Sequence, residues 1–203
     1  MSAVQVYALR ISRDLSSEEW GALLEILPYR RRQRLLRTRE DKQIQVLCAY
    51  GALHLALQRQ YDFYGFPPIA IAEGGKPYFP DYPNIQFNLS HTEGAVVCAV
   101  NQTPVGVDLE RSRPPADNIL HYYHFTESRD FWEMWVRRES IAKYHGQGFA
   151  ALAHWNEALE QGVTCRPLAL LDGYYASLTT SSPDPLSIYI ASLEEIADAA
   201  AGR

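Results

Sequence analysis

Three carboxylates are spaced so that they could hold a cation together. The stretch "VGVDLE" alternates like a β-strand, which puts Asp108 and Glu110 on one face. A third carboxylate, Glu139, lies in "WVRRESIAK", where helical spacing brings it near Lys143. Neighbouring carboxylates repel each other, and their hard oxygen atoms suit Mg²⁺. The pattern indicates a magnesium site, although a solvated strand end and an ordinary surface pair between Glu139 and Lys143 also fit it.

Positive charge gathers in one segment of an otherwise acidic chain. The segment "RRRQRLLRTREDK" holds seven of the 19 basic residues: Arg30, Arg31, Arg32, Arg34, Arg37, Arg39 and Lys42. Such a run is typical of either a solvated helical face or an anion site. Together with the metal and this segment, Lys76 in "GGKPY" and His91 in "NLSH" describe a site for a polyphosphate-like ligand. Taken alone, a histidine at a strand end is more often structural, and Lys76 would be an exposed lysine in a Gly-Pro loop.

The elements that must position these residues occur in a repeated order. "VQVYALRI" alternates like a strand, and "SSEEWGALLEIL" predicts a helix capped by Ser16 or Ser17 and ended by Pro28. A helical period runs from Asp41 to Tyr61, and "IQFNLSH", "AVVCAV" and "PVGVDLE" predict a three-stranded antiparallel meander. A second helix over 127–145 and three more strands, "PLALL", "YYASLTT" and "LSIYIAS", repeat that order.

The repeat predicts an α+β fold with a pseudo-twofold arrangement of two similar halves. Each half is a long helix packed on a small, mainly antiparallel three-stranded sheet. The N-terminal half spans 1–103 and contains the basic segment. The C-terminal half spans 104–203 and contains the metal carboxylates. We expect the site in the cleft between them, because such clefts commonly bind ligands. Two joined halves also make a monomer sufficient.

Composition narrows the class of protein. The chain has 203 residues, 47% apolar and 21% charged, which is ordinary globular usage. The net charge of -5 disfavours nucleic-acid binding. The sequence contains neither a membrane-spanning run nor a signal-peptide pattern, so we expect a cytoplasmic protein that does not enter a membrane. Cys48, Cys98 and Cys165 are far apart and predict free thiols.

Taken together, "GGKPYFP", "FNLSHTEG", "VGVDLE" and "WVRRESIAK" resemble, in order and roughly in spacing, the motifs of the Sfp-type 4'-phosphopantetheinyl transferases. The close likeness spans residues 76 to 143. It implies a two-halved α+β fold. It also implies Mg²⁺-dependent transfer of the phosphopantetheine arm of coenzyme A to a serine hydroxyl of an acyl or peptidyl carrier protein, with release of adenosine 3',5'-bisphosphate.

The resemblance also implies roles for single residues. Asp108, Glu110 and Glu139 would bind Mg²⁺, and Lys143 would hold charge as the leaving group departs. Catalysis would rest on Asp108, Glu139 and Lys143, with either Glu139 or a metal-bound water as the base. The implied contacts to coenzyme A are Lys76, His91, Arg30, Arg34, Ser90 and Arg138.

Three features depart from the family pattern. Arg138 stands where the family has lysine, and arginine does not release a proton near neutral pH. Gln33 and Gln45 stand where the comparison leads us to expect cations, a loss that Lys42 or Arg34 would compensate. The stretch from Phe125 to Trp135, which helps receive the carrier protein in the family, is short.

Two other readings remain open. The first is a non-catalytic homologue that binds coenzyme A or a carrier protein. The second is another kind of nucleotide phosphotransferase or hydrolase, for which the chain lacks a P-loop or dinucleotide pattern.

Overall fold

The computed structural model describes residues 3–148, 152, 155–181, 183 and 185–203. The helices are α1 (Ser17–Ile26), α2 (Tyr29–Leu35), α3 (Glu40–Tyr61), α4 (Asp117–Tyr122), α5 (Ser128–His145) and α7 (Leu193–Ala200), with a 3-10 turn η1 (Glu157–Glu160). The strands are β1 (Val4–Arg10), β2 (Ala70–Ile71), β3 (Pro77–Tyr78), β4 (Gln86–Thr92), β5 (Ala95–Asn101), β6 (Val105–Arg111), β7 (Thr164–Leu168), β8 (Tyr174–Thr180) and β9 (Leu186–Ala191).

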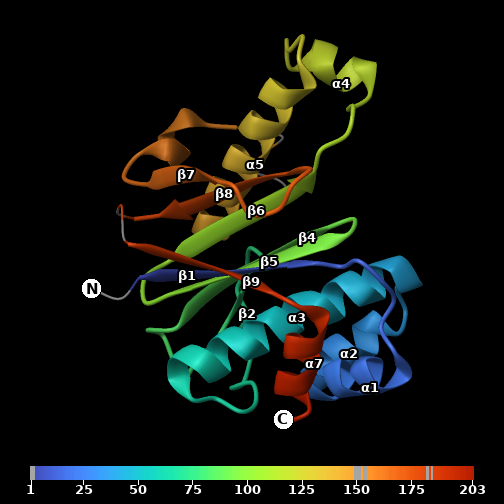
Figure 1. Cartoon of the computed structure of the whole chain (residues 1–203). Helices are drawn as coiled ribbons and strands as arrows, with labels where there is room; N and C mark the ends of the chain where they lie inside the picture. The colour runs from blue at the N-terminus through green and yellow to red at the C-terminus, as the bar shows by residue number, and fades with distance from the viewer. Residues whose placement is uncertain (1–2, 149–151, 153–154, 182, 184) are drawn as a thin grey trace.

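Two larger sheets are stacked between helices, which confirms the α+β class. One sheet has the order β4-β5-β1-β9 and the other the order β6-β8-β7, while β2 and β3 form a short hairpin. Figure 1 shows α5 above the three-stranded sheet, the four-stranded sheet beneath it, and α3 with α1, α2 and α7 at the bottom. Neighbouring strands are antiparallel, except that β9 runs parallel to β1.

The core has two parts, on the two faces of the four-stranded sheet. Leu47 and Leu53 of α3 pack with Phe87 on one face, and Val6 and Val107 meet between the two sheets. Because both faces of this sheet are covered, β1 and β5 are apolar along nearly their whole length. Each fully buried side chain of this kind contributes roughly 1.5–3 kcal/mol.

The predicted helices are confirmed, and their ends have local causes. The hydroxyl of Ser16 accepts from the Glu19 amide and the Glu19 side chain accepts from the Ser16 amide, a capping box that starts α1. Leu27, just before Pro28, ends it. The helix predicted from Asp41 to Tyr61 is α3, and the helix predicted over 127–145 is α5. In the described part of the chain, no helix combines the length and apolarity needed to cross a membrane.

Two strand placements predicted from the sequence are wrong. The strand "LSIYIAS" was expected beside the other C-terminal strands, but β9 pairs with β1, with Leu186 opposite Val4. The strand "PVGVDLE" was expected to continue the meander of β4 and β5, but β6 pairs with β8 in the other sheet. Both errors concern the partner of a strand, which depends on contacts far apart in the chain and not on the local pattern.

Candidate functional site

Asp108 lies where β4, β6 and α5 meet. Its Oδ1 accepts a hydrogen bond from Lys143 Nζ at 2.5 Å and another from the Ser90 hydroxyl at 2.8 Å. Lys143 Nζ also donates to the Ser90 hydroxyl at 3.0 Å. The Asp108 side chain is 3% exposed and that of Lys143 is 25% exposed. The structure therefore brings together three residues that the sequence predicts for the site, around one buried ion pair.

The other two carboxylates lie close by and carry excess negative charge. Glu110 accepts a hydrogen bond from the Thr92 hydroxyl at 3.1 Å, and Glu139 lies 3.7 Å from Lys143 Nζ. Burial and the charge of Asp108 raise the pKa of Glu110. Burial raises the pKa of Glu139 to about 7, with Lys143 opposing the rise and Asp108 adding to it. A further cation would relieve this repulsion.

The donor set fits a hard divalent metal in its chemistry. Asp108 Oδ2 is buried and has no hydrogen-bond partner among the described residues, so one carboxylate oxygen is available as a ligand. As the side chains lie, no group of three His, Cys, Asp or Glu residues in the described part of the chain is arranged to hold a metal ion. The Lys143 ammonium is the cation paired with Asp108 in this structure.

A seam of side chains joins β4 to β6. Asn88, Ser90 and Thr92 alternate along β4, and each bonds to β6: the Asn88 amide oxygen accepts from the Val107 amide at 2.9 Å, while Ser90 and Thr92 donate to the carboxylates. Of these three residues, only Ser90 was predicted for the site from the sequence. The missed signal was the polar alternation in "FNLSHT", which is unusual for a strand buried on both faces.

Gly106 lets α5 approach β6. A Cβ atom at this position would lie 2.0 Å from the Ser140 carbonyl oxygen and 2.4 Å from the Tyr144 amide nitrogen, both of α5. Only glycine fits such a close approach of two backbones. The contact brings the helix that carries Glu139 and Lys143 against the strand that carries Asp108.

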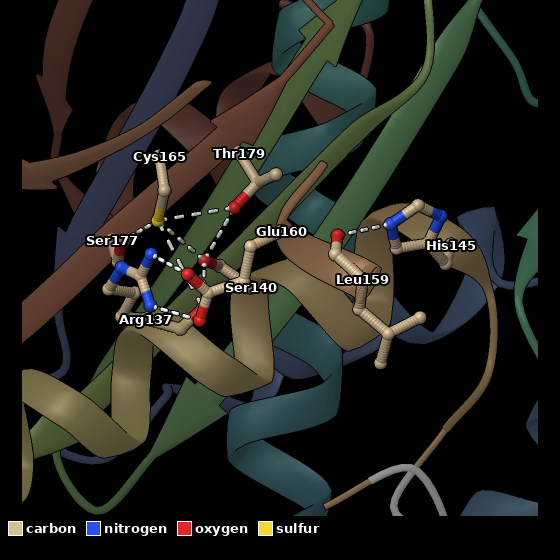
Figure 2. A network of polar contacts seen from close by, with 8 residues as sticks. All are labelled: Arg137, Ser140, His145, Leu159, Glu160, Cys165, Ser177 and Thr179. Atoms are coloured by element: carbon tan, nitrogen blue, oxygen red, sulfur yellow. Dashed lines mark hydrogen bonds and ion pairs between the residues drawn. The ribbon is translucent and has the colours of Figure 1, made fainter. Parts of the chain in front are cut away.

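Polar contacts on another side of α5 fix the helix to its sheet (Figure 2). Arg137 donates two hydrogen bonds to Glu160, each at 2.5 Å. The Ser140 hydroxyl lies 2.8 Å from that of Thr179 on β8, and the thiol of Cys165 lies 3.0 Å from the Ser177 hydroxyl. The three cysteines are free, as predicted. The Ser140–Thr179 contact joins α5 to β8, and the Arg137–Glu160 pair joins α5 to η1.

His91 lies on β4 beside the carboxylate cluster, among cations. Its Nδ1 is 3.1 Å from the side-chain oxygen of Gln45, which also accepts from Lys42 Nζ at 3.2 Å. Burial lowers the pKa of His91 to about 4, and the charges of Lys42, Lys143 and Arg31 lower it further than Asp108 can raise it. The imidazole is therefore neutral at physiological pH, in a position suited to an anion.

The low pKa of His91 predicts a pH-dependent stability. A histidine in the unfolded chain has a pKa of about 6.5. Below that pH the unfolded state binds a proton at His91, whereas the folded state leaves His91 unprotonated until the pH nears 4. As the pH falls from 7 toward 4, this residue should reduce the free energy of unfolding by up to about 3 kcal/mol. Urea titrations of the wild type and His91→Gln across this range measure the difference. The control His121→Gln changes an exposed residue and retains His91, so it should follow the wild type. Parallel curves for wild type and His91→Gln would contradict the prediction.

The arginines predicted to contact coenzyme A lie on α2 and α5. Arg30 and Arg34 are exposed on α2. Arg31 is partly buried, with its guanidinium 5.6 Å from the ring centre of Tyr50, and its charge acts on His91. Arg138 lies over the ring of Trp155, 4.9 Å from its centre. Arg31 and Lys42 are thus the members of the basic segment whose charge reaches His91.

Lys76 reaches across to the C-terminal half of the chain. Its ammonium donates to the Val105 carbonyl at 2.9 Å and to the Tyr144 carbonyl at 3.2 Å. Burial lowers the pKa of Lys76 to about 8. Its predicted contact with a nucleotide phosphate stays a prediction.

A cavity of about 720 Å³ opens next to Glu110. Aromatic side chains of α5 and of the C-terminal end of α4 form part of its lining, with Tyr123, Phe131 and Trp135 in mutual contact. Arg113 and Glu110 both line the cavity, and the charge of Arg113 acts on Glu110. A ligand with an apolar part could lie here with its charged end at the carboxylates.

Comparison with known proteins agrees with the motifs. No family model matches the chain. The chain is 28% identical to a 4'-phosphopantetheinyl transferase of Bacillus subtilis and 27% identical to the 4'-phosphopantetheinyl transferase Sfp of Bacillus subtilis strain 168, each over 72% of both chains. It is 37% identical to the 4'-phosphopantetheinyl transferase gsp of Aneurinibacillus migulanus over 37% of both chains. The motifs that hold the carboxylates, Ser90 and Lys143 and these likenesses point the same way: over 72% of its length the chain is similar to 4'-phosphopantetheinyl transferases of the Sfp type.

Proposed function

We propose that the protein transfers the 4'-phosphopantetheine moiety of coenzyme A to a serine hydroxyl of an acyl or peptidyl carrier protein and releases adenosine 3',5'-bisphosphate. One observation carries the proposal. Ser90, Asp108 and Lys143, from three motifs far apart in the chain, form a single buried cluster with two more carboxylates beside it. The likeness to transferases over 72% of the chain supports the same reaction.

Mg²⁺ is proposed as the cofactor, held by Asp108, Glu110 and Glu139. The free Asp108 Oδ2 and the raised pKa values of the two glutamates support this assignment. When bound, the metal would neutralise charge on the pyrophosphate of coenzyme A. Lys143 stays charged, since Asp108 and Glu139 outweigh the effect of burial on its pKa, and it is placed to stabilise the departing phosphate. Glu139 is the candidate that accepts the serine proton.

The phosphates of coenzyme A are proposed to bind the cations around His91. We add Arg31 and Lys42 to the phosphate contacts that the family resemblance implies, because their charges already act on the neutral imidazole of His91. The implied contacts of Ser90, Arg30, Arg34 and Arg138 remain part of the proposal, whereas the ammonium of Lys76 is engaged by two backbone carbonyls. The cavity beside Glu110 would receive the apolar pantetheine arm or the carrier protein.

The pseudo-twofold division into 1–103 and 104–203 also remains a proposal. It is supported by α3 and α5, which each pack on the outer face of one sheet. β9 and α7 belong to the second segment by sequence but pack with the first, so any such symmetry excludes them. The monomeric state and the cytoplasmic location stay predictions.

The non-catalytic alternative rested on Arg138 and Gln33. Arg138 stacks on Trp155, and Gln33 is exposed on α2, so neither substitution touches the buried cluster. This favours the active transferase.

Removing the metal should stop the reaction. We expect adenosine 3',5'-bisphosphate, measured by liquid chromatography, to form only when coenzyme A, an apo carrier protein and Mg²⁺ are all present. Chelation by EDTA should reduce its formation by at least about a hundredfold, because the three carboxylates then have no divalent cation to present to the pyrophosphate. Excess Mg²⁺ should restore it. Undiminished turnover in EDTA would contradict the metal assignment, and formation without a carrier would indicate a hydrolase.

A further inference from the structure

Lys76 joins the two elements that carry the candidate site. Its ammonium donates to the carbonyl of Val105, the first residue of β6, and to that of Tyr144, in the last turn of α5. β6 carries Asp108 and Glu110, and α5 carries Glu139 and Lys143. One side chain from the β2–β3 hairpin therefore spans the strand and the helix whose spacing sets the geometry of the cluster.

The end of α5 leaves a carbonyl for this ammonium. The last four carbonyls of a helix lack intrahelical partners. Gly146, at φ 69°, turns the chain so that its amide bonds to the Lys143 carbonyl and the Gln147 amide bonds to the Ala142 carbonyl. The carbonyl of Tyr144 takes the Lys76 ammonium, and a cation there also complements the helix dipole.

The hairpin that carries Lys76 fits tightly against this helix end. A Cβ atom at Gly74 would lie 1.6 Å from the Gly146 carbonyl oxygen, so the two backbones touch directly. Gly75, at φ 87°, closes the turn, and the Ala72 amide bonds to the Lys76 carbonyl at 2.9 Å. The backbone beneath Lys76 is thus fixed on both sides, which gives the ammonium a defined position.

The surroundings of Lys76 are those of a structural cation. Its charge is held by two carbonyl dipoles, and burial is the cause of its lowered pKa, with no carboxylate raising it. Contact with a nucleotide phosphate would compete with these two bonds. Lys42, in contrast, is exposed, and its ammonium donates to the Gln45 side chain beside His91.

We propose that Lys76 is a positioning residue that fixes α5 against β6 through the Val105 and Tyr144 carbonyls and so holds Glu139 and Lys143 beside Asp108. The proposal rests on the transferase function for its kinetic consequence. On this proposal, two of the three lysines of the chain have different roles: Lys76 positions α5, and Lys42 contacts an anion. The family resemblance, in contrast, implies a phosphate contact for Lys76.

Lys76→Met and Lys42→Met form a matched pair for the kinetic test. Methionine keeps most of the side-chain length and removes the ammonium. Lys76→Met should lower kcat by about tenfold or more, since small displacements of reacting groups are costly. Its KM and Kd for coenzyme A should stay within about twofold of the wild type. Lys42→Met should raise both constants and leave kcat nearly unchanged. Lys76→Arg, which retains donors for the carbonyls, should recover part of the lost kcat.

Two kinetic outcomes would overturn the proposal. If Lys76→Met raises KM and Kd for coenzyme A as Lys42→Met does, with kcat retained, Lys76 is a phosphate ligand. If Lys76→Met lowers only the melting temperature and leaves kcat and KM intact, its role is merely structural.

Amide hydrogen exchange without substrate tests the same clamp independently of turnover. Lys76→Met should speed exchange in the last turn of α5 and at the start of β6, and leave β1 and β5 unchanged. Unchanged exchange at both places would overturn the clamp. A wild type that transfers nothing to carrier proteins would refute the proposed function, and the exchange result would still decide the role of Lys76.

Discussion

Asp108→Asn should lower the rate of phosphopantetheine transfer by at least about a hundredfold, a typical loss when one preorganised electrostatic contact is removed. The substitution keeps the size of the side chain and removes the charge that Lys143 and the proposed Mg²⁺ share. Asparagine offers one neutral oxygen where aspartate offers Oδ1 to Lys143 and a free Oδ2. Single-turnover transfer to an apo carrier protein measures the effect.

The same substitution should also destabilise the protein, because it leaves the Lys143 ammonium without its closest carboxylate. Breaking a buried ion pair costs roughly 3 kcal/mol. The double variant Asp108→Asn/Lys143→Met should regain stability and stay inactive, which separates folding from chemistry. The exposed Asp81→Asn is the control and should match the wild type. Full activity of Asp108→Asn would remove Asp108 from the metal site.

Gly106→Ala should destabilise the fold by about 3 kcal/mol, at the upper end of what overpacking costs. The added methyl group would meet the Ser140 carbonyl and the Tyr144 amide, and neither backbone group can rotate away. The helix must move off β6, which takes Glu139 and Lys143 away from Asp108. We therefore expect a lower unfolding midpoint in urea and a lower kcat in the same variant.

Gly21→Ala is the matched control for this prediction. Gly21 lies inside α1, and a Cβ atom there would meet no atom within 4 Å. Alanine should stabilise this helix by roughly 0.5–1 kcal/mol relative to glycine. Equal stability of Gly106→Ala and the wild type would show that the approach of α5 to β6 is looser than described.

Local patterns were sufficient to predict the faces of the elements that form the site. The alternation in "VGVDLE" separates Val107, which packs between the sheets, from Asp108, which faces Lys143. The helical period predicts the approach of Glu139 to Lys143. Both follow from the periods of strand and helix, which act within a few residues.

Other features depend on contacts that no local pattern contains. The basic run from Arg30 to Lys42 is divided between two helices, because α2 ends at Leu35 and α3 begins at Glu40. The pairing of β9 with β1 joins residues far apart in the chain. The acceptors of Lys76 are backbone carbonyls, which any sequence supplies.

The most direct test of the transferase function is the intact mass of an apo carrier protein after incubation with this protein, coenzyme A and Mg²⁺, with Asp108→Asn as the control. We predict a gain equal to one phosphopantetheine group with the wild type and almost none with the control. An unchanged carrier mass across acyl and peptidyl carrier proteins, with coenzyme A still bound by the wild type, would contradict it and favour the non-catalytic homologue.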